Sequence, residues 1–438
     1  MNIGFISLGC PKNLVDTEIM MSLLKKGGHR IVNSPERADL VVINTCGFID
    51  EAKEESIDAI IEVGRLKDNG VVKYIIATGC LVQRYGQELL EEMPELDGVL
   101  GISHFKEIAS AVEAIESSER PLKISGPPAN FIEYGRRMLT TPPGMAYMKI
   151  AEGCDNVCAY CAIPSIRGRL RSKPLEEIEK EGAILARQGI KELVVIAQDT
   201  AAYGMDLYGR PCLPRVLDAL GNIEGLEWLR VMYLHPLHFS SELIEALAGN
   251  PKVVPYLDIP IQHVSDHILA AMNRQHDLDL LVNLLGQLKQ QISDLVLRTT
   301  VMLGFPGEEE SDFLLLSEFL EEIKFDWLGA FVFTPEEGTP AALLDKQVPA
   351  ELAADRREQI MLRQKSITRA KNIMRIGRQE RILVSSRLEN NLYLGRGYYQ
   401  APEVDGLTII KTTANLPKGE FVSAQLKAVR NYDLVAEM

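Results

Sequence analysis

The 438-residue sequence lacks the features of membrane and secreted proteins. It contains no run of about 18 apolar residues, so we predict no membrane-spanning helix and no membrane partner. Its start, MNIGFISLGC, has neither a basic segment nor a long apolar stretch, so we expect no secretory signal and a cytoplasmic location. The apolar fraction of 46% and the charged fraction of 25% are those of a globular protein.

Positive charge is in deficit, with 47 Lys and Arg residues against 61 Asp and Glu residues and a net charge of −14. Such a surface repels phosphate, which argues against a large, unspecific nucleic-acid footprint. A local basic patch would still allow contacts with RNA. Cysteines are also few and odd in number, which argues against the disulfide framework of short secreted chains.

Six of the seven cysteines fall into two spaced triplets, Cys10, Cys46 and Cys80, and Cys154, Cys158 and Cys161. In a reducing compartment, clustered cysteines are better explained as metal ligands than as disulfides. The seventh, Cys212, has no partner at ligand spacing, and we interpret it as structurally incidental.

The chain length predicts two or three domains. Residues 1–118 alternate β-branched runs with helical stretches, which predicts an N-terminal parallel α/β sheet. Paired prolines flank SGPPANFIEYGRRMLTTPPG, and we place a linker at residues 119–139. Six strand signals separated by helices within 140–370 predict a partial β/α barrel. Alternating residues broken by Gly, Asn and Pro within 373–438 predict a small antiparallel β-barrel.

The first triplet follows predicted parallel strands: Cys10 follows IGFISL, Cys46 follows DLVVIN and Cys80 follows YIIAT. Carboxyl ends of parallel strands line one crevice, so the fold is expected to bring these distant residues together. Three thiolates favour an iron–sulfur cluster, with one iron left open to a sulfur species. The alternative is three buried cysteines that serve as small hydrophobes. Adjoining glycines should let the backbone approach an inorganic group closely: Gly9, Gly47 and Gly79.

The second triplet lies on one tight loop, CDNVCAYC. Structural zinc normally requires four closed ligands, and no fourth cysteine is nearby, so zinc fits poorly. The spacing fits a four-iron cluster whose open iron binds S-adenosylmethionine through its amino and carboxylate groups. One electron then cleaves the S–C bond to give a 5′-deoxyadenosyl radical, which abstracts hydrogen from an unactivated carbon.

The sequence resembles the radical S-adenosylmethionine methylthiotransferases along essentially the whole chain. The segments that carry the resemblance are SLGCPKNLVDTE, INTCGFI, ATGCLVQRY, CDNVCAYCAIPSIRGRLRSK, AQDTAAYG, DIPIQHVSDHIL and MLGFPGEEESDF. The resemblance implies a methylthiotransferase domain, a radical S-adenosylmethionine core and a C-terminal TRAM domain. It also implies a transferase that uses two [4Fe-4S] clusters and two molecules of S-adenosyl-L-methionine per turnover.

Within that family, SLGCPKN resembles the branch that modifies a ribosomal protein, whereas the tRNA branch more usually has Gln-Met-Asn after the first cysteine. The resemblance therefore implies methylthiolation of the β-carbon of an aspartate in ribosomal protein 12 of the small subunit. This partner would be modified either free or on the ribosome, and the sulfur and electron donors are not indicated. Two alternatives stay open: a tRNA adenosine methylthiotransferase and a non-catalytic iron–sulfur carrier.

Several residues beyond the cysteines are candidates for binding the cofactor. Gln198 and Asp199 end a barrel strand, where active-site residues sit, and are predicted to contact the methionine moiety. Arg169 belongs to a basic run that would bind a carboxylate or form a solvated face: Arg167, Arg169, Arg171 and Lys173.

Two further segments are weaker candidates. His263 and His267 have the spacing of metal ligands on a helix, although we favour a packing or hydrogen-bonding role. The segment GFPGEEE at 304–310 would line the adenosine pocket, and it lacks the ending of a phosphate loop.

Overall fold

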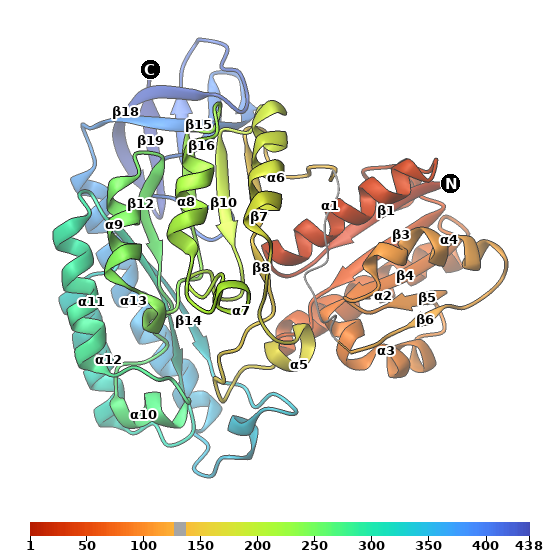
Figure 1. Ribbon diagram of the computed structural model, residues 1–438, viewed down its shortest axis with the longest axis horizontal. Coiled ribbons are helices and arrows are strands. Elements are labelled where there is room, and N and C mark those ends of the chain that lie inside the picture. The colour runs from red at the N-terminus through yellow and green to blue at the C-terminus, as the bar shows by residue number, and fades with distance from the viewer. Residues whose placement is uncertain (127–136) are drawn as a thin grey trace.

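Two parallel sheets and a closed barrel organise the computed structural model, which describes residues 1–126 and 137–438 (Figure 1). The predicted fold class is confirmed, since an α/β sheet, a partial barrel and a small β-barrel follow one another along the chain. Part of the predicted linker, residues 127–136, lies outside the described residues, and the domain boundaries stay predictions. No helix in the described part of the chain is long and apolar enough to cross a membrane.

The N-terminal sheet has the strand order β2-β1-β3-β4-β5-β6, and all its neighbours are parallel. Its strands are β1 (Asn2–Ser7), β2 (Arg30–Ile31), β3 (Leu40–Thr45), β4 (Tyr74–Gly79), β5 (Gly98–Leu100) and β6 (Leu122–Lys123). Its helices are α1 (Pro11–Lys26), α2 (Asp50–Asp68), α3 (Cys80–Glu92) and α4 (Ile108–Glu116). The central strand β3 is buried at every residue, as expected for a strand that helices cover on both faces.

The second sheet has the order β14-β13-β12-β11-β10-β7, with β7 and β14 as its edges. Its strands are β7 (Met145–Lys149), β10 (Glu192–Ile196), β11 (Trp228–Val231), β12 (Val253–Asp258), β13 (Val296–Leu303) and β14 (Trp327–Val332). A two-stranded ladder pairs β8 (Ala151–Glu152) with β9 (Arg171–Ser172). The six strands coincide with the six strand signals read from the sequence, and the open sheet agrees with a partial barrel.

Helices flank this second sheet and form most of its outer layer (Figure 1). They are α5 (Ile163–Arg167), α6 (Leu175–Arg187), α7 (Met205–Tyr208), α8 (Leu213–Gly221), α9 (Ser241–Gly249), α10 (Asp266–Ala271), α11 (Leu278–Gln291), α12 (Glu310–Ile323) and α13 (Ala350–Met374). A capping box between Glu309 and Asp312 fixes the start of α12. The polar helix α13 packs along β14 and leads to the C-terminal barrel.

The C-terminal barrel closes in the order β15-β16-β17-β19-β18. Its strands are β15 (Gln379–Glu389), β16 (Leu392–Arg396), β17 (Thr408–Lys411), β18 (Phe421–Arg430) and β19 (Asp433–Glu437). Most pairs are antiparallel, as predicted, but β17 and β19 pair in parallel. A buried ion pair joins this barrel to the central sheet, because Arg396 of β16 contacts Glu192 at the start of β10, which also pairs with Arg230 of β11.

Figure 1 shows the N-terminal sheet beside the β7 edge of the central sheet, with the C-terminal barrel over one end of it. Helix α1 packs against β7, and α3 packs against α5. The carboxyl ends of β1, β3 and β4 therefore face the loop that carries the second cysteine triplet.

Candidate active site

The first cysteine triplet sits at the carboxyl ends of three adjacent strands. Cys10 precedes the first turn of α1, Cys46 follows β3, and Cys80 opens α3. Thr45 of β3 lies in register with Gly79 of β4, so the next residues along both strands are Cys46 and Cys80. The fold thus brings together three residues that lie far apart in the sequence, as the strand pattern predicts.

Glycines allow the cysteine-bearing loops to approach one another. A Cβ on Gly9 would lie 2.8 Å from Sγ of Cys46, and Gly9 adopts a φ of +81°. A Cβ on Gly79 would lie 2.4 Å from the carbonyl oxygen of Thr45. Both close contacts are with protein atoms. Glycine is therefore needed here for the packing of the loops, in addition to the predicted close approach of an inorganic group.

The thiols of this triplet influence one another electrostatically. Burial, together with the neighbouring thiols of Cys80 and Cys10, raises the pKa of Cys46 to about 12. Burial also raises the pKa of Cys80, although Arg167 opposes this shift. Binding of a metal deprotonates such thiols, so three close thiols with a nearby guanidinium fit an iron–sulfur cluster.

The second triplet lies between β8 and α5. Burial raises the pKa of Cys154 and of Cys161 to about 12 in each case, and neighbouring thiols contribute in the same direction. Arg274 lies close to this loop, with Nη1 3.8 Å from Sγ of Cys158 and 3.4 Å from the hydroxyl of Tyr160. Among the described residues no fourth cysteine adjoins either triplet, because the remaining one, Cys212, lies buried at the start of α8. Three thiols on a tight loop fit a four-iron cluster with one open iron.

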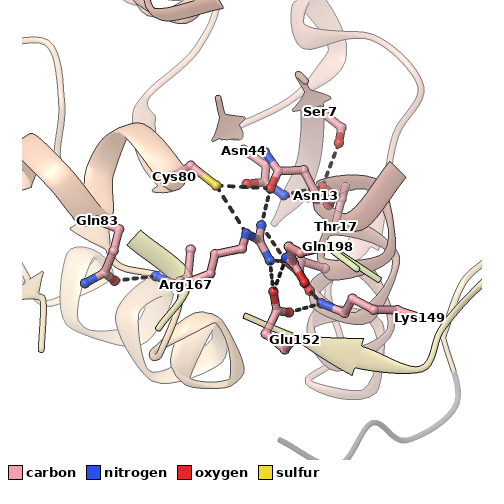
Figure 2. A network of polar contacts seen from close by, with 12 residues as sticks. Ser7, Asn13, Thr17, Asn44, Cys80, Gln83, Lys149, Glu152, Arg167 and Gln198 are labelled. Atoms are coloured by element: carbon pink, nitrogen blue, oxygen red, sulfur yellow. Dashed lines mark hydrogen bonds and ion pairs between the residues drawn. The ribbon is translucent and has the colours of Figure 1, made fainter. Parts of the chain in front are cut away.

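Arg167 joins the two cysteine regions in a buried polar network (Figure 2). Its Nε donates to Sγ of Cys80 over 3.4 Å, and its Nη2 donates to Oδ1 of Asn13. Its Nη1 donates to Oε1 of Glu152 over 2.6 Å and forms an ion pair with Asp16 at 3.3 Å. Burial disfavours the charge on Arg167, but Cys80, Glu152 and Asp16 outweigh it and raise its pKa.

The same network includes Lys149 of β7. Its Nζ lies 2.5 Å from Asp16 and 2.6 Å from Glu152, so the two carboxylates are shared by two cations. Burial alone would raise the pKa of Glu152, but Arg167 and Lys149 lower it overall. The network therefore fixes helix α1 of the N-terminal sheet against the loop that carries the second triplet.

A cavity of about 200 Å³ opens beside the second triplet. Its lining residues are Cys154, Asp155, Asn156, Val157, Cys158, Leu170, Asp199, Ala202, Met205, His235, Leu237, His238, Asn273 and Gln275. Asp199 is central to it, since its carboxylate accepts from Asn156 Nδ2 and lies 2.7 Å from His238 Nδ1. Burial raises the pKa of Asp199, but His238 and the hydrogen bond from Asn156 lower it overall.

The three residues predicted to bind the cofactor lie in three different environments. Asp199 lines the cavity, and Gln198 donates from Nε2 to Glu152 over 2.9 Å while its buried Oε1 has no partner within the described residues. Arg169 is exposed on the loop before β9. All three assignments stay predictions.

A solvated basic face is the wrong interpretation for most of the basic run. Arg167, Arg171 and Lys173 are at most 6% exposed, because the chain folds the segment beneath the cluster loop. Arg171 donates to backbone carbonyls of Arg169 and Arg167, and Lys173 pairs with Glu181. Arg169 alone faces solvent.

The histidine pair does not share a helix face. His263 precedes α10 and accepts from the backbone N–H of Ser265, whose hydroxyl lies 2.9 Å from Nδ1 of His267. This agrees with the hydrogen-bonding role. In the 304–310 segment, Glu308 accepts from the N–H of Gly304 and pairs with Arg356 of α13, which gives that loop a structural role.

Sequence reasoning missed several residues of this site. Lys149 and Glu152 both precede the loop triplet in the sequence, and the segment HPLH after β11 supplies His235 and His238. Asp199, His235 and His238 together have ligand atoms within 4.8 Å of one another. His235 Nδ1, however, accepts from the N–H of Leu237, and burial lowers the pKa of His235 to about 2. Its role in the cavity is therefore that of a neutral imidazole held by the backbone.

Comparison with known proteins agrees with this architecture. Residues 2–101 match the uncharacterized protein family UPF0004, residues 148–320 match the radical SAM superfamily, and residues 376–438 match the TRAM domain. The chain is 58% identical over 437 residues to the ribosomal protein uS12 methylthiotransferase RimO of Syntrophomonas wolfei, with 100% of each chain covered. It is 43% identical to the RimO of Desulforamulus reducens, over 100% of this chain and 99% of that protein. The chain belongs to the RimO family.

Members of the RimO family are radical S-adenosylmethionine methylthiotransferases, and this chain is therefore a radical S-adenosylmethionine enzyme that carries iron–sulfur chemistry. Solved structures support the fold alone. The radical S-adenosylmethionine methyltransferase TsrM from Kitasatospora setae aligns with a TM-score of 0.59 at 13% identity, over 78% of this chain and 77% of TsrM. The cobalamin-dependent enzyme OxsB aligns with a TM-score of 0.55 at 12% identity, over 82% of this chain and 56% of OxsB.

Proposed function

We propose that this chain methylthiolates the β-carbon of an aspartate in ribosomal protein uS12. The observation that carries the proposal is the presence of two three-thiol sites across one buried interface, in a chain that matches uS12 methylthiotransferases over its full length. A ribosomal substrate is consistent with the cytoplasmic location expected from the sequence. The tRNA enzyme is not favoured, because the full-length relatives are named for the ribosomal protein.

Each triplet would hold one [4Fe-4S] cluster: Cys10, Cys46 and Cys80 the first, and Cys154, Cys158 and Cys161 the second. When bound, the first cluster supplies sulfur, and the second, with S-adenosylmethionine, supplies the radical that abstracts hydrogen. The geometry supports this division, since the second triplet borders the cavity and the first lies across Arg167 from it.

The protein's own groups would bind and orient the cofactor in the cavity. Asp199, held by Asn156 and His238, presents a buried carboxylate that suits the amino group of S-adenosylmethionine. Outside the cavity lining, Gln198 offers its buried Oε1, which has no partner among the described residues, and the exposed Arg169 offers a guanidinium for a carboxylate. The ion pairs around Arg167 are buried, so they would keep water out of the region between the two cysteine triplets.

Incubation of the reduced, reconstituted enzyme with uS12 and with tRNA in parallel tests the proposal. We expect 5′-deoxyadenosine to form and one methylthio group to appear on uS12, on an aspartate identified by fragmentation. A uS12 variant with Asn at that aspartate is the matched control. Methylthioadenosine in tRNA together with unmodified uS12 would show that the chain is a tRNA methylthiotransferase. Absence of 5′-deoxyadenosine with fully loaded enzyme would favour a non-catalytic iron–sulfur carrier.

A further inference from the structure

One buried cation near the first triplet has no carboxylate of its own. Lys12 is 6% exposed, in the first turn of α1 and two residues after Cys10. Its Nζ lies 3.2 Å from the ring centroid of Tyr233, at the carboxyl end of β11. Residues 1–126 and 137–438 provide no ion pair for this ammonium.

The carboxylates around Lys12 are already neutralised by other cations. Glu152 is close enough to Lys12 to interact with its charge, but Glu152 already forms ion pairs with Lys149 and Arg167. Asp258 also lies nearby but pairs with Arg298 at 3.0 Å. Among the described residues, Lys12 is therefore left without a carboxylate to itself.

The position of Lys12 is unfavourable in two further respects. A helix N-terminus carries partial positive charge, so a cation in the first turn of α1 is repelled rather than stabilised. A buried ammonium also loses hydration, which the face of an aromatic ring replaces only in part. Both costs fall when an anion binds beside the ammonium.

Tyr233 is itself held in an uncommon conformation. Its φ is +64°, in the left-handed region that non-glycine residues rarely adopt. The N–H of Tyr233 donates to Asp258 over 3.2 Å, and its carbonyl accepts from the N–H of Thr200 over 2.9 Å. Such strain concentrates at functional sites, and here it presents the ring to Lys12 across the domain interface.

We propose that Lys12, seated on Tyr233, binds the carboxylate of the aspartate side chain that the enzyme modifies. The inference rests on the proposed function and deepens it, because it names the group that distinguishes an acidic side chain from a nucleobase. Lys12 lies on helix α1, which packs on the N-terminal sheet, and Tyr233 follows β11 of the central sheet, so the subsite exists only when the two sheets are docked. A carboxylate here would lie next to Cys10, on the side of the proposed sulfur-supplying triplet.

Binding of uS12 to the reconstituted holoenzyme tests the inference, with native uS12 compared with its variant that carries Asn at the modified aspartate. We expect wild-type enzyme to prefer the aspartate form by about 10- to 100-fold, the effect of one charge-assisted hydrogen bond. Lys12→Met should bind both forms equally and keep its full iron content, and Lys12→Arg should restore part of the preference. Lys25→Met, at an exposed position of the same helix, is the matched control and should behave as wild type.

Two outcomes would overturn the inference while the proposed function stands. The first is a Lys12→Met enzyme that still prefers the aspartate form of uS12. The second is a Lys12→Met enzyme that has lost the iron of the first triplet, which would make Lys12 a partner of the cluster. If wild-type enzyme neither binds nor modifies uS12, the proposed function fails and the inference fails with it.

Discussion

Arg167, the last residue of helix α5 after the second triplet, donates a hydrogen bond from Nε to Sγ of Cys80 in the first triplet over 3.4 Å. Arg167 is 1% exposed, and its guanidinium also binds Glu152 and Asp16. A single side chain thus connects a thiol of one proposed cluster site to the loop that carries the other.

Arg167→Lys keeps a positive charge but loses the directed bond to Cys80. A cation and an N–H donor near a cluster favour its reduced form, because reduction adds negative charge. We therefore expect a lower reduction potential for the cluster on the first triplet, with that on the second triplet changed less. A redox titration followed by electron paramagnetic resonance measures both potentials, and Arg187→Lys, at an exposed site, is the control. An unchanged potential of the first cluster would show that Arg167 only holds the interface.

The two triplets should bind iron independently. The triple variant C10A/C46A/C80A and the triple variant C154A/C158A/C161A should each keep about one four-iron cluster, whereas C212A should keep both. Only the variant of the second triplet should lose the formation of 5′-deoxyadenosine. Iron and sulfide analysis with product chromatography measures these outcomes. Loss of all iron in either triple variant would mean that the sites form one unit.

Asp199→Asn should weaken the binding of S-adenosylmethionine. The substitution preserves shape but removes the charge that His238 and Asn156 hold in place. The loss of one charge-assisted contact, about 1.5–3 kcal/mol, corresponds to an affinity lower by about 10- to 100-fold. Equilibrium binding to enzyme loaded with the second cluster measures it, with the exposed Asp218→Asn as control. Unchanged affinity would exclude Asp199 from the cofactor site.

Glu192 should make the junction with the C-terminal barrel sensitive to acid. Burial raises the pKa of this carboxyl, but Arg396 and Arg230, at 2.6 Å and 2.8 Å, lower it overall. Because the pKa is lower in the folded state than its ordinary value of 4.5, the ionised carboxylate stabilises the folded state at pH values above 4.5. This stabilisation is lost as the pH falls through the folded-state pKa.

Glu192→Gln should therefore lower the free energy of unfolding by about 3–5 kcal/mol at neutral pH, the usual effect of breaking a buried ion pair. The difference from wild type should shrink as pH falls below 4.5 and through the lowered folded-state pKa of Glu192, because the carboxyl then becomes neutral like the amide. Urea unfolding of the apoprotein at neutral pH and at a series of lower pH values measures it. A difference that does not depend on pH would mean that packing rather than charge explains the loss.

The sequence predicted the elements whose patterns are local. The strands ending before Cys10, Cys46 and Cys80 are apolar and β-branched, and the alternation with helices indicated that they lie parallel in one sheet. The loop triplet was recognisable from spacing alone. Short edge strands such as β6 were missed, because two residues carry too little pattern to detect.

The contacts between domains could not be predicted. Arg167 and Arg169 belong to the same basic run, yet one is buried against Cys80 and the other is exposed. The difference depends on how the N-terminal sheet docks, which the run itself does not encode. Lys12 was visible as part of SLGCPKN, but its position on Tyr233 follows only from the packing of two domains.

The proposed function is tested most directly by mass spectrometry of uS12 from cells that lack this gene, complemented with either the wild-type chain or C10A/C46A/C80A. We expect the wild-type chain to restore one methylthio group on a single aspartate and the triple variant to restore none. Unmodified uS12 in cells that express the wild-type, iron-loaded chain would contradict it.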